Sequence, residues 1–265
     1  MYSPFTLAAK YARYYFTAAN GKGHGIHSPF VFEFVQKILN DRTRYPEYLR
    51  VEELRRDLVK DHGSIEVLDL GAGSTVTSGS SRTVSQIARH AAKPRKFGQL
   101  LFRMARFYQP SGIFELGTSL GISTAYLALG NSAAVTISIE GSPLIAEKAR
   151  LNLKQLRLTS AKIITGNFET QLGVVLPGLE SPGMVFIDGN HRKLPTIDYF
   201  HQVLPYMQTG SILIFDDIHW SREMEEAWEV IKCHPDVKLT VDLFFVGIIF
   251  FRSEFLVKQH FAIRF

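Results

Sequence analysis

Three carboxylates and two histidines follow two short apolar runs in the second half of the chain. Residues 184–191 read MVFIDGNH, and residues 211–220 read SILIFDDIHW. The apolar runs predict buried strands of a parallel sheet, and ligands bind outside the carboxyl ends of such strands. If the strands are neighbours, Asp188, Asp216 and Asp217 converge, and carboxylates that close repel one another unless a cation joins them. Hard oxygen ligands suit Mg²⁺, Mn²⁺ or Ca²⁺, so the sequence predicts a divalent metal site there. In the alternative, Asp188 only orders a cofactor loop, and Asp216 or Asp217 caps a turn.

The two histidines, His191 and His219, each stand three residues after an aspartate. Imidazole titrates near neutral pH and serves as a general base in many enzymes. We assign catalysis to His191 together with Asp188, and we keep His219 as a second candidate base or as a neighbour of the metal. The alternative for either histidine is an exposed position in a loop. Trp220 is either a wall of the pocket or ordinary packing.

A glycine-containing turn lies in residues 114–124, which read FELGTSLGIST. A nucleoside site of the α/β type needs a strand that ends in a glycine turn, then a helix with free N–H groups. A second strand must follow and end in an acid that takes the ribose hydroxyls, about 20 residues on. Here a predicted strand at 112–116 precedes a helix at 119–129, and the next strand, 134–139, ends at Glu140. The sequence therefore predicts the cofactor site in this segment.

A second glycine turn, residues 67–74, reads VLDLGAGS but does not meet these requirements. A polar loop and then a basic helix follow it, and the position expected for the acid falls near Arg89 and His90. Because a glycine pattern alone is weak support for a nucleotide site, we interpret this turn as part of a hairpin outside the cofactor site.

The spacing of the first turn argues against a nicotinamide cofactor. Gly117 and Gly121 form G-x-x-x-G, whereas dinucleotide sites carry G-x-G-x-x-G around the pyrophosphate. Glu115, just before the turn, suits a cationic amino group better than a phosphate. These features favour a ligand with an amino-acid moiety.

The order of predicted elements divides the chain near residue 95. From residue 96 onward strands and helices alternate, as is typical of a parallel α/β sheet. The later predicted strands are 162–165, 184–187 and 211–215, followed by a hairpin of 237–243 and 247–252. Residues 1–95 lack this alternation and predict helices over 2–19, 28–39 and 45–60.

Residues 96–252 resemble the class I methyltransferases that depend on S-adenosylmethionine (SAM), and specifically the catechol and caffeoyl-CoA O-methyltransferase group. The first motif of that group, E-L-G-x-x-x-G-x-S, matches residues 115–123, and Gly98-Gln99 matches its upstream Gly-Gln pair. Residues 23–30, GHGIHSPF, add a resemblance to an uncharacterised bacterial methyltransferase family. The resemblance implies a Rossmann-like, doubly wound α/β sheet of seven strands with the last strand antiparallel. We expect this SAM-binding domain over 96–265, with a mainly helical cap over 1–95.

The resemblance also implies the roles of individual residues around SAM. The group expected at the methionine part comprises Glu115, Gly117, Ser119 and Ser123. The ribose hydroxyls are expected at Glu140 and the adenine at Gly166, Asn167 and Phe168. The further residues expected to contact the cofactor are Thr118, Gly121, Gly141, Ser142 and Asp188. The related O-methyltransferases bind a divalent metal through Asp, Asp and Asn. This chain has Asp217 where they have the Asn, which is a departure from their pattern. They carry a general-base lysine where this chain has His191. The implied reaction is in-line transfer of the methyl group to an acceptor oxygen.

Composition sets broad limits on the class of protein. The chain has 265 residues, 46% hydrophobic and 21% charged, which suits a globular protein with a sizeable core. Its single cysteine, Cys233, excludes an intramolecular disulfide and fits a reducing compartment. Residues 1–20 do not read as a signal peptide, and no apolar run is long enough to span a bilayer. We therefore expect a cytoplasmic location.

Charge and partners leave several alternatives open. Residues 1–106 carry 17 Lys and Arg against 9 Asp and Glu, whereas the remainder carries 13 against 16. A basic first part suits nucleic acid, anionic lipid or an acidic substrate, but no nucleic-acid motif is present, and a solvated basic face is the simpler interpretation. We expect a small aromatic or anionic acceptor. The alternatives are a metal-independent methyltransferase with another acceptor, including nucleic acid, and a non-catalytic module that binds SAM or a partner. A homodimer is one option for the oligomeric state.

Overall fold

The computed structural model describes residues 1–67, 81–90, 92–178 and 181–265. The chain divides into two compact units. The terminal unit combines Met1–Arg42 with Glu180–Phe265, and the middle unit is Thr43–Leu179. Most of the second glycine turn, residues 68–74, lies outside the described residues, so its interpretation stays a prediction.

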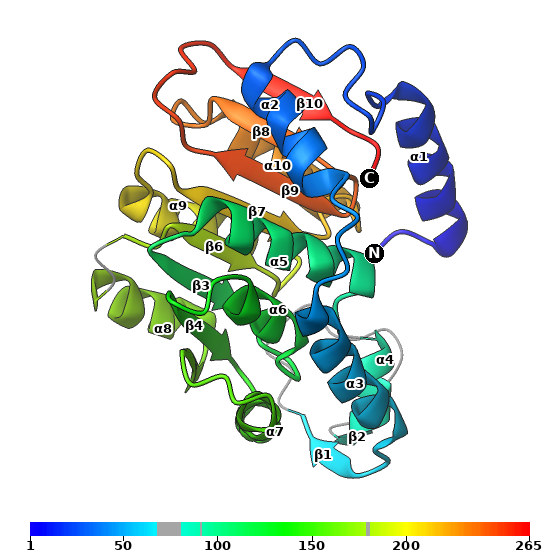
Figure 1. The fold of residues 1–265 in the computed structure, drawn as a ribbon, viewed down its shortest axis with the longest axis vertical. Coiled ribbons are helices and arrows are strands. Elements are labelled where there is room, and N and C mark those ends of the chain that lie inside the picture. Colours follow the sequence, from blue (N-terminus) through cyan, green and yellow to red (C-terminus); the bar gives the residue numbers. More distant parts are fainter. Residues whose placement is uncertain (68–80, 91, 179–180) are drawn as a thin grey trace. The chain divides into compact units, whose positions relative to one another are not determined.

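The middle unit contains the first glycine turn within a β-α-β-α-β arrangement (Figure 1). Its strands and crossover helices are β3 (Gly112–Leu116), α6 (Ile122–Gly130), β4 (Val135–Glu140), α7 (Pro143–Gln155) and β5 (Ala161–Thr165). The three strands pair in parallel, with Leu116 opposite Ile139 and Glu140 opposite Thr165. This pairing confirms the parallel α/β character that the alternating pattern predicts.

Helix α6 begins at Ile122, three residues later than the sequence predicts. The backbone φ angle is positive at Gly117 (99°), Ser119 (48°) and Gly121 (81°). These values lie outside the right-handed helical region, so regular helix starts only after the last of them. The turn is therefore longer than expected, and it carries more of the predicted cofactor-binding residues.

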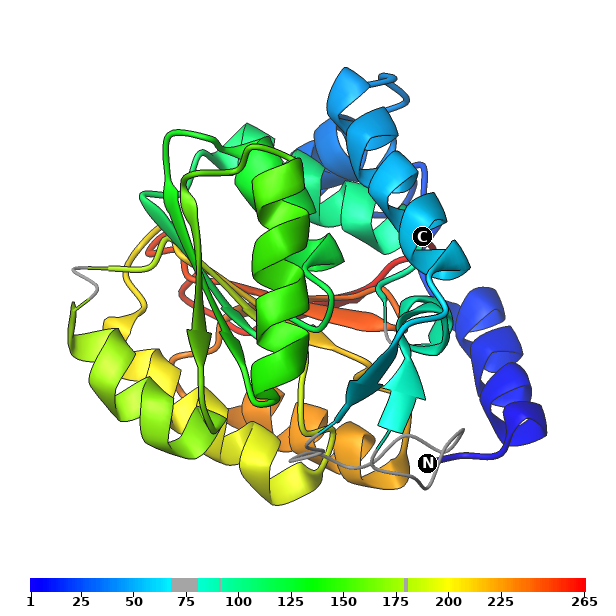
Figure 2. The ribbon, with the colours of Figure 1, turned by 90° about the horizontal axis from the view of Figure 1, so that it is seen from below.

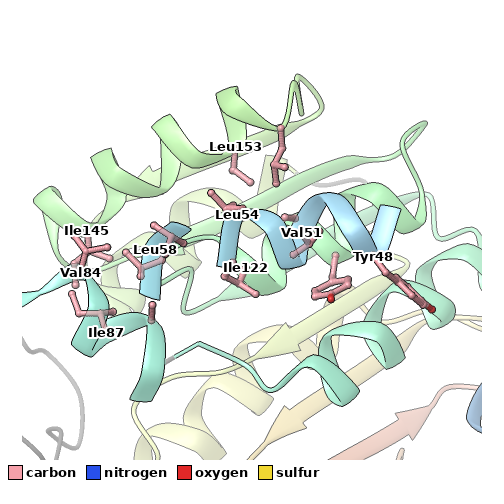
Figure 3. Packing of buried hydrophobic residues seen from close by; sticks show 14 of the residues in the cluster. Tyr48, Val51, Leu54, Leu58, Val84, Ile87, Ile122, Ile145 and Leu153 are labelled. Atoms are coloured by element: carbon pink, nitrogen blue, oxygen red, sulfur yellow. The ribbon is translucent and has the colours of Figure 1, made fainter. Parts of the chain in front are cut away.

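Three further helices of the middle unit cover α6 and α7 with apolar side chains. They are α3 (Pro46–Lys60), α4 (Val84–His90) and α5 (Arg95–Tyr108). Tyr48, Val51, Leu54 and Leu58 recur at helical spacing on α3 and lie close to Ile122 of α6 (Figure 3). Such a stripe of buried residues stabilises a helix against its neighbours through apolar burial.

Two small strands of the middle unit lie beside the second glycine turn in the sequence. β1 (Ser64–Glu66) and β2 (Ser81–Thr83) pair antiparallel, with Ser64 opposite Thr83. These strands flank residues 68–80, which lie outside the described residues, so the hairpin expected for the second glycine turn stays a prediction.

The terminal unit is built on five strands in the order β10-β8-β9-β7-β6. Their bounds are β6 (Met184–Ile187), β7 (Ile212–Asp216), β8 (Leu239–Asp242), β9 (Val246–Phe250) and β10 (Gln259–Ala262). β6 and β7 are parallel, whereas β9 is antiparallel to both β7 and β8. Helices α9 (Lys193–Val203) and α10 (Arg222–Cys233) lie side by side (Figure 2). The predicted fully buried strand, the predicted hairpin and the single antiparallel strand are all present.

Among the described residues, apart from the pair β1 and β2, the middle unit has three strands and the terminal unit has five. This total of eight exceeds the predicted seven by one. The additional strand is β10, which pairs in parallel with β8 and is at best half-buried. Its residues, Gln259 to Ala262, show no long apolar run, so nothing local distinguishes them from a C-terminal tail. The expected fold class is otherwise confirmed.

The N-terminal residues contribute helices, as expected. α1 (Pro4–Thr17) is capped by Ser3, and α2 (Pro29–Phe34) by Ser28 with Pro29 at its first position; α2 continues as a π-helical turn, Val35–Leu39. Ala19, just after α1, forms a bridge with Ile263 near the C-terminus. The compact units therefore group residues 1–42 with the C-terminal strands, and the predicted domain boundary near residue 95 stays a proposal. No described helix is long and apolar enough to cross a membrane.

Candidate functional site

The glycine turn of the middle unit closes over the end of β4. The backbone N–H groups of Gly117 and Thr118 both donate to the carbonyl oxygen of Ile139, over 3.0 and 3.2 Å. The left-handed backbone at Ser119 is uncommon for a residue with a side chain, and its surroundings must hold it in place. The turn is thus a fixed loop rather than an extension of the helix.

Glu140 provides that hold. Its Oε2 accepts a hydrogen bond from the N–H of Ser119 over 2.8 Å, and its Oε1 accepts one from the N–H of Ser142 over 2.9 Å. Burial raises the pKa of Glu140 above its ordinary value, although backbone N–H donors from Ser142, Ser119 and Gly141 oppose that shift. A carboxylate has about four acceptor positions, so these donors leave room for a hydroxyl group of a ligand.

Glu115 is fully buried, at 0% exposure. Its Oε2 accepts hydrogen bonds from the hydroxyls of Thr124 and Ser138, the latter over 2.6 Å. The Ser138 hydroxyl also lies 2.5 Å from that of Thr118. These hydrogen bonds connect Glu115 to Thr118 in the turn through Ser138. Because Glu115 is buried, this favours an indirect role, in which Glu115 supports the turn. Its predicted direct contact with the methionine part of SAM stays a prediction.

The residues expected at the adenine follow β5 directly. The N–H of Gly166 donates to the carbonyl oxygen of Glu140 over 2.9 Å, which places this segment next to the expected ribose site. Asn167 caps α8 (Phe168–Val175) by accepting from the N–H of Glu169. Phe168 is half-buried at the start of that helix. The middle unit therefore brings together the predicted residues that follow β3, β4 and β5.

In the terminal unit, Asp188, His191 and Asp216 converge at the ends of β6 and β7. One ligand atom from each lies within 4.8 Å of the other two, and Asp216 is buried. The His191 Nε2 lies 3.6 Å from the Asp188 Oδ1, which is longer than a hydrogen bond but within ion-pair range. The predicted convergence of Asp188 with Asp216 is therefore present in the structure.

Asp217 does not belong to this group of three, although it was expected as the third ligand. Its φ angle is 53°, and its N–H donates to the carbonyl oxygen of Phe245 over 2.6 Å. His191 takes the third place instead. Two carboxylates and an imidazole fit a divalent cation, and the nitrogen shifts the preference from Mg²⁺ towards Mn²⁺ and its transition-metal neighbours.

Two polar or aromatic neighbours border His191. The Trp220 ring centroid is 5.6 Å from that of His191, so Trp220 lies close enough to be a wall of a site. Asn190, with a φ angle of 49°, donates from its side-chain amide to the Tyr199 hydroxyl over 3.1 Å. The loop after β6 is thereby tied to α9.

His219 lies outside the group of three and belongs to a different polar cluster. Its Nδ1 is 3.1 Å from the Glu225 Oε1, and its Nε2 is 2.8 Å from the Asp242 Oδ2. Burial lowers the pKa of His219, but the hydrogen bonds and charges of Asp242 and Glu225 outweigh burial, and the net shift is upward. Sequence reasoning missed both carboxylates because Glu225 lies on the next helix and Asp242 in a later strand, and neither forms a recognisable pattern with His219.

Comparisons with known proteins agree with this geometry. Residues 114–218 match a family model described as a methyltransferase domain. A catechol O-methyltransferase of Niastella koreensis is 32% identical over 130 residues, which are 46% of this chain and 55% of the relative. The chain thus matches about half the length of that curated relative.

Solved structures show the same fold at low sequence identity. An O-methyltransferase from Bacillus cereus, in complex with SAH, has a TM-score of 0.56 at 19% identity and covers 83% of this chain and 97% of its own. The SAH-bound methyltransferase PaMTH1 of Podospora anserina has a TM-score of 0.59 at 14% identity, with 96% and 98% covered. TomG from Streptomyces achromogenes, in complex with SAM, has a TM-score of 0.57 at 17% identity, with 80% and 92% covered. Residues 114–218 therefore match a methyltransferase-domain model, the solved structures share the fold, and the resemblance to the O-methyltransferases is confirmed.

Proposed function

We propose that this protein transfers the methyl group of SAM to an oxygen of a small acceptor, with a divalent metal at Asp188 and Asp216. The observation that carries the proposal is the left-handed turn of residues 117–121, fastened to Glu140 within the methyltransferase domain. The turn leads into the N-terminus of α6, where the first N–H groups of a helix suit a ligand, and the carboxylate beside the turn suits ribose hydroxyls. The related catechol O-methyltransferase supports oxygen as the acceptor atom.

The terminal unit supplies the groups for the chemistry. When bound, a divalent metal would stabilise the deprotonated acceptor oxygen as a Lewis acid. Asp188 and Asp216 would hold it, with either His191 or Asp217 as a third ligand. These two arrangements exclude each other in mechanism, because a neutral imidazole that binds a metal through one nitrogen carries its proton on the other nitrogen and cannot act as a base.

If Asp217 is the ligand, His191 is the general base. The carboxylate of Asp188 favours a proton on the His191 Nε2, which leaves Nδ1 to accept the proton of the acceptor hydroxyl. The new bond then forms between that oxygen and the methyl carbon while the carbon–sulfur bond of SAM breaks. The chain contributes mainly by holding the two reactants in line.

A metal-independent version of the same transfer is the second candidate. The distance of 3.6 Å between His191 and Asp188 also suits a carboxylate-oriented base that works without a metal. In either version we propose a cytoplasmic enzyme in which residues 1–95 cap the acceptor.

Isothermal titration of SAM into EDTA-treated protein tests the proposal, followed by catechol with and without Mn²⁺. We expect SAM to bind in both conditions and catechol to bind only with Mn²⁺. Binding of SAM with no effect of metal on catechol selects the metal-independent version. Absence of SAM binding contradicts the proposed function.

A further inference from the structure

Helix α1 and the residues before it contact α10, within the same terminal unit, through polar groups that the proposed chemistry does not use. The hydroxyl of Tyr2 donates to the Glu225 Oε2 over 2.7 Å, and the Lys10 ammonium reaches both oxygens of that carboxylate, over 2.9 and 3.1 Å. Glu225 lies on α10 and also contacts His219. A single carboxylate of α10 thus joins α1 to the loop after β7.

The same cluster continues on the other side of His219. The Tyr14 hydroxyl lies between the carbonyl oxygens of Ile263 and Asp242, the latter at 3.0 Å, and the side chain of Asp242 contacts the His219 Nε2. The His219 ring stacks on Phe244 with 5.1 Å between centroids and 25° between planes. Tyr11 of α1 packs edge-on against the same Phe244 ring at 5.0 Å. His219 is therefore held on both ring nitrogens and on one face.

His219, with its contacts to Glu225, Asp242 and Phe244, is the residue directly before Trp220. The N–H of Tyr2 donates to the carbonyl oxygen of Trp220 over 3.1 Å, and the N–H of Trp220 donates back to Asp217 over 2.9 Å. The loop of residues 217–220 is thus held by Tyr2, which precedes α1, and it presents the Trp220 ring beside His191. Glu225 touches neither His191 nor the two aspartates of the group of three in any contact described above.

We propose that α1, through Glu225, holds the loop of residues 217–220 so that Trp220 forms a wall of the acceptor site. Glu225 is then a positioning residue for the acceptor and has no part in binding SAM. This inference rests on the proposed function. Because polar groups in one network act as a unit, loss of the Glu225 carboxylate should loosen the Trp220 side chain, while the backbone hydrogen bond from Tyr2 stays and nothing changes at Asp188 or Asp216.

The test compares Glu225→Gln with Glu226→Gln. Glu226 is the next residue of α10 and pairs with Lys193 and Arg222 instead of α1, so it is a matched control. We expect Glu225→Gln to raise the acceptor KM about fivefold to tenfold, with kcat within about twofold and the Kd of SAM unchanged. The control should leave all three values unchanged. Lys10→Met should also raise the acceptor KM. It replaces Glu225→Gln in the test if that variant does not fold.

A double-mutant cycle with Trp220→Ala separates positioning from general stability. If Glu225 acts through Trp220, adding Glu225→Gln to Trp220→Ala has no further effect on KM. The inference is wrong if the KM changes of the two single variants multiply in the double variant. It is also wrong if Glu225→Gln has the same acceptor KM as the control.

Tryptophan fluorescence provides a readout that does not need activity. The chain has two tryptophans, and Trp228 is only 1% exposed, so acrylamide quenching reports mainly on Trp220. We expect stronger quenching in Glu225→Gln than in the wild type and the control, with the difference lost in Trp220→Phe. If the wild-type protein transfers no methyl group, the proposed function fails, and quenching alone decides the inference: equal quenching in all three proteins overturns it.

Discussion

Replacement of Glu140 by glutamine should weaken SAM binding far more than it weakens the fold. The carboxylate accepts backbone N–H groups on both oxygens, from Ser119 and from Ser142. A glutamine side chain keeps one acceptor oxygen and presents an N–H₂ group at the other position, where it cannot accept. The variant therefore loses one hydrogen bond within the loop and the charge that strengthens bonds from the ribose hydroxyls.

The magnitude follows from the type of bond lost. A hydrogen bond to a charged group contributes about 1.5–3 kcal/mol, which corresponds to an increase in Kd of roughly tenfold to 150-fold. The free energy of unfolding should change less, because burial already disfavours the charged form of Glu140 and the neutral variant avoids that cost.

Isothermal titration of SAM and urea unfolding measure the two effects of Glu140→Gln. Glu147→Gln is a suitable control, since Glu147 is an exposed residue of α7 paired only with Arg150 among the ion pairs that the described residues form. We expect the control to bind SAM like the wild type. A Kd for Glu140→Gln within about twofold of the wild-type value would refute the assignment of the ribose site.

Three further predictions concern pH, packing and metal. Because burial raises the pKa of Glu140, protonation should reduce SAM affinity at a higher pH than for an ordinary glutamate; titrations from about pH 4 to about pH 8 should show a decline towards acid that Glu140→Gln lacks. A Cβ at Gly98 would lie 2.5 Å from the Tyr126 ring, so Gly98→Ala should lower the free energy of unfolding by about 1–3 kcal/mol, as urea unfolding measures; an unchanged midpoint would show that α5 and α6 adjust freely. Electron paramagnetic resonance measures the affinity for Mn²⁺ in His191→Ala and Asp217→Ala. The variant that lacks the third ligand should bind Mn²⁺ about tenfold or more weakly than the wild type. Equal affinity in the wild type and both variants contradicts a metal site that uses either residue.

Local patterns in the sequence were enough to predict the α/β class and the position of the glycine turn, whose cofactor role stays a prediction. The glycine spacing, the helix that follows and the acid at Glu140 are close together in the chain, so each can be recognised without a tertiary model. The carboxylates Asp188 and Asp216 were predictable for a similar reason. Each ends an apolar run, and the carboxyl ends of adjacent parallel strands meet at one edge of a sheet.

Contacts between distant residues explain what the sequence could not predict. β10 is a strand only because its backbone pairs with β8, and its own composition gives no sign of that. His219 looked like a candidate base until Glu225 and Asp242, which are 6 and 23 residues away, placed it in a clamp with α1.

The sequence by itself determined which residues end the strands and where the backbone turns on glycine, because periodicity and backbone freedom are local properties. The tertiary structure alone decided how those residues are used. It buried Glu115 among hydroxyls, and it placed His191 rather than Asp217 with the two aspartates. Burial and partners depend on residues far along the chain, and they set both the charge that a side chain carries and the ligand that it can reach.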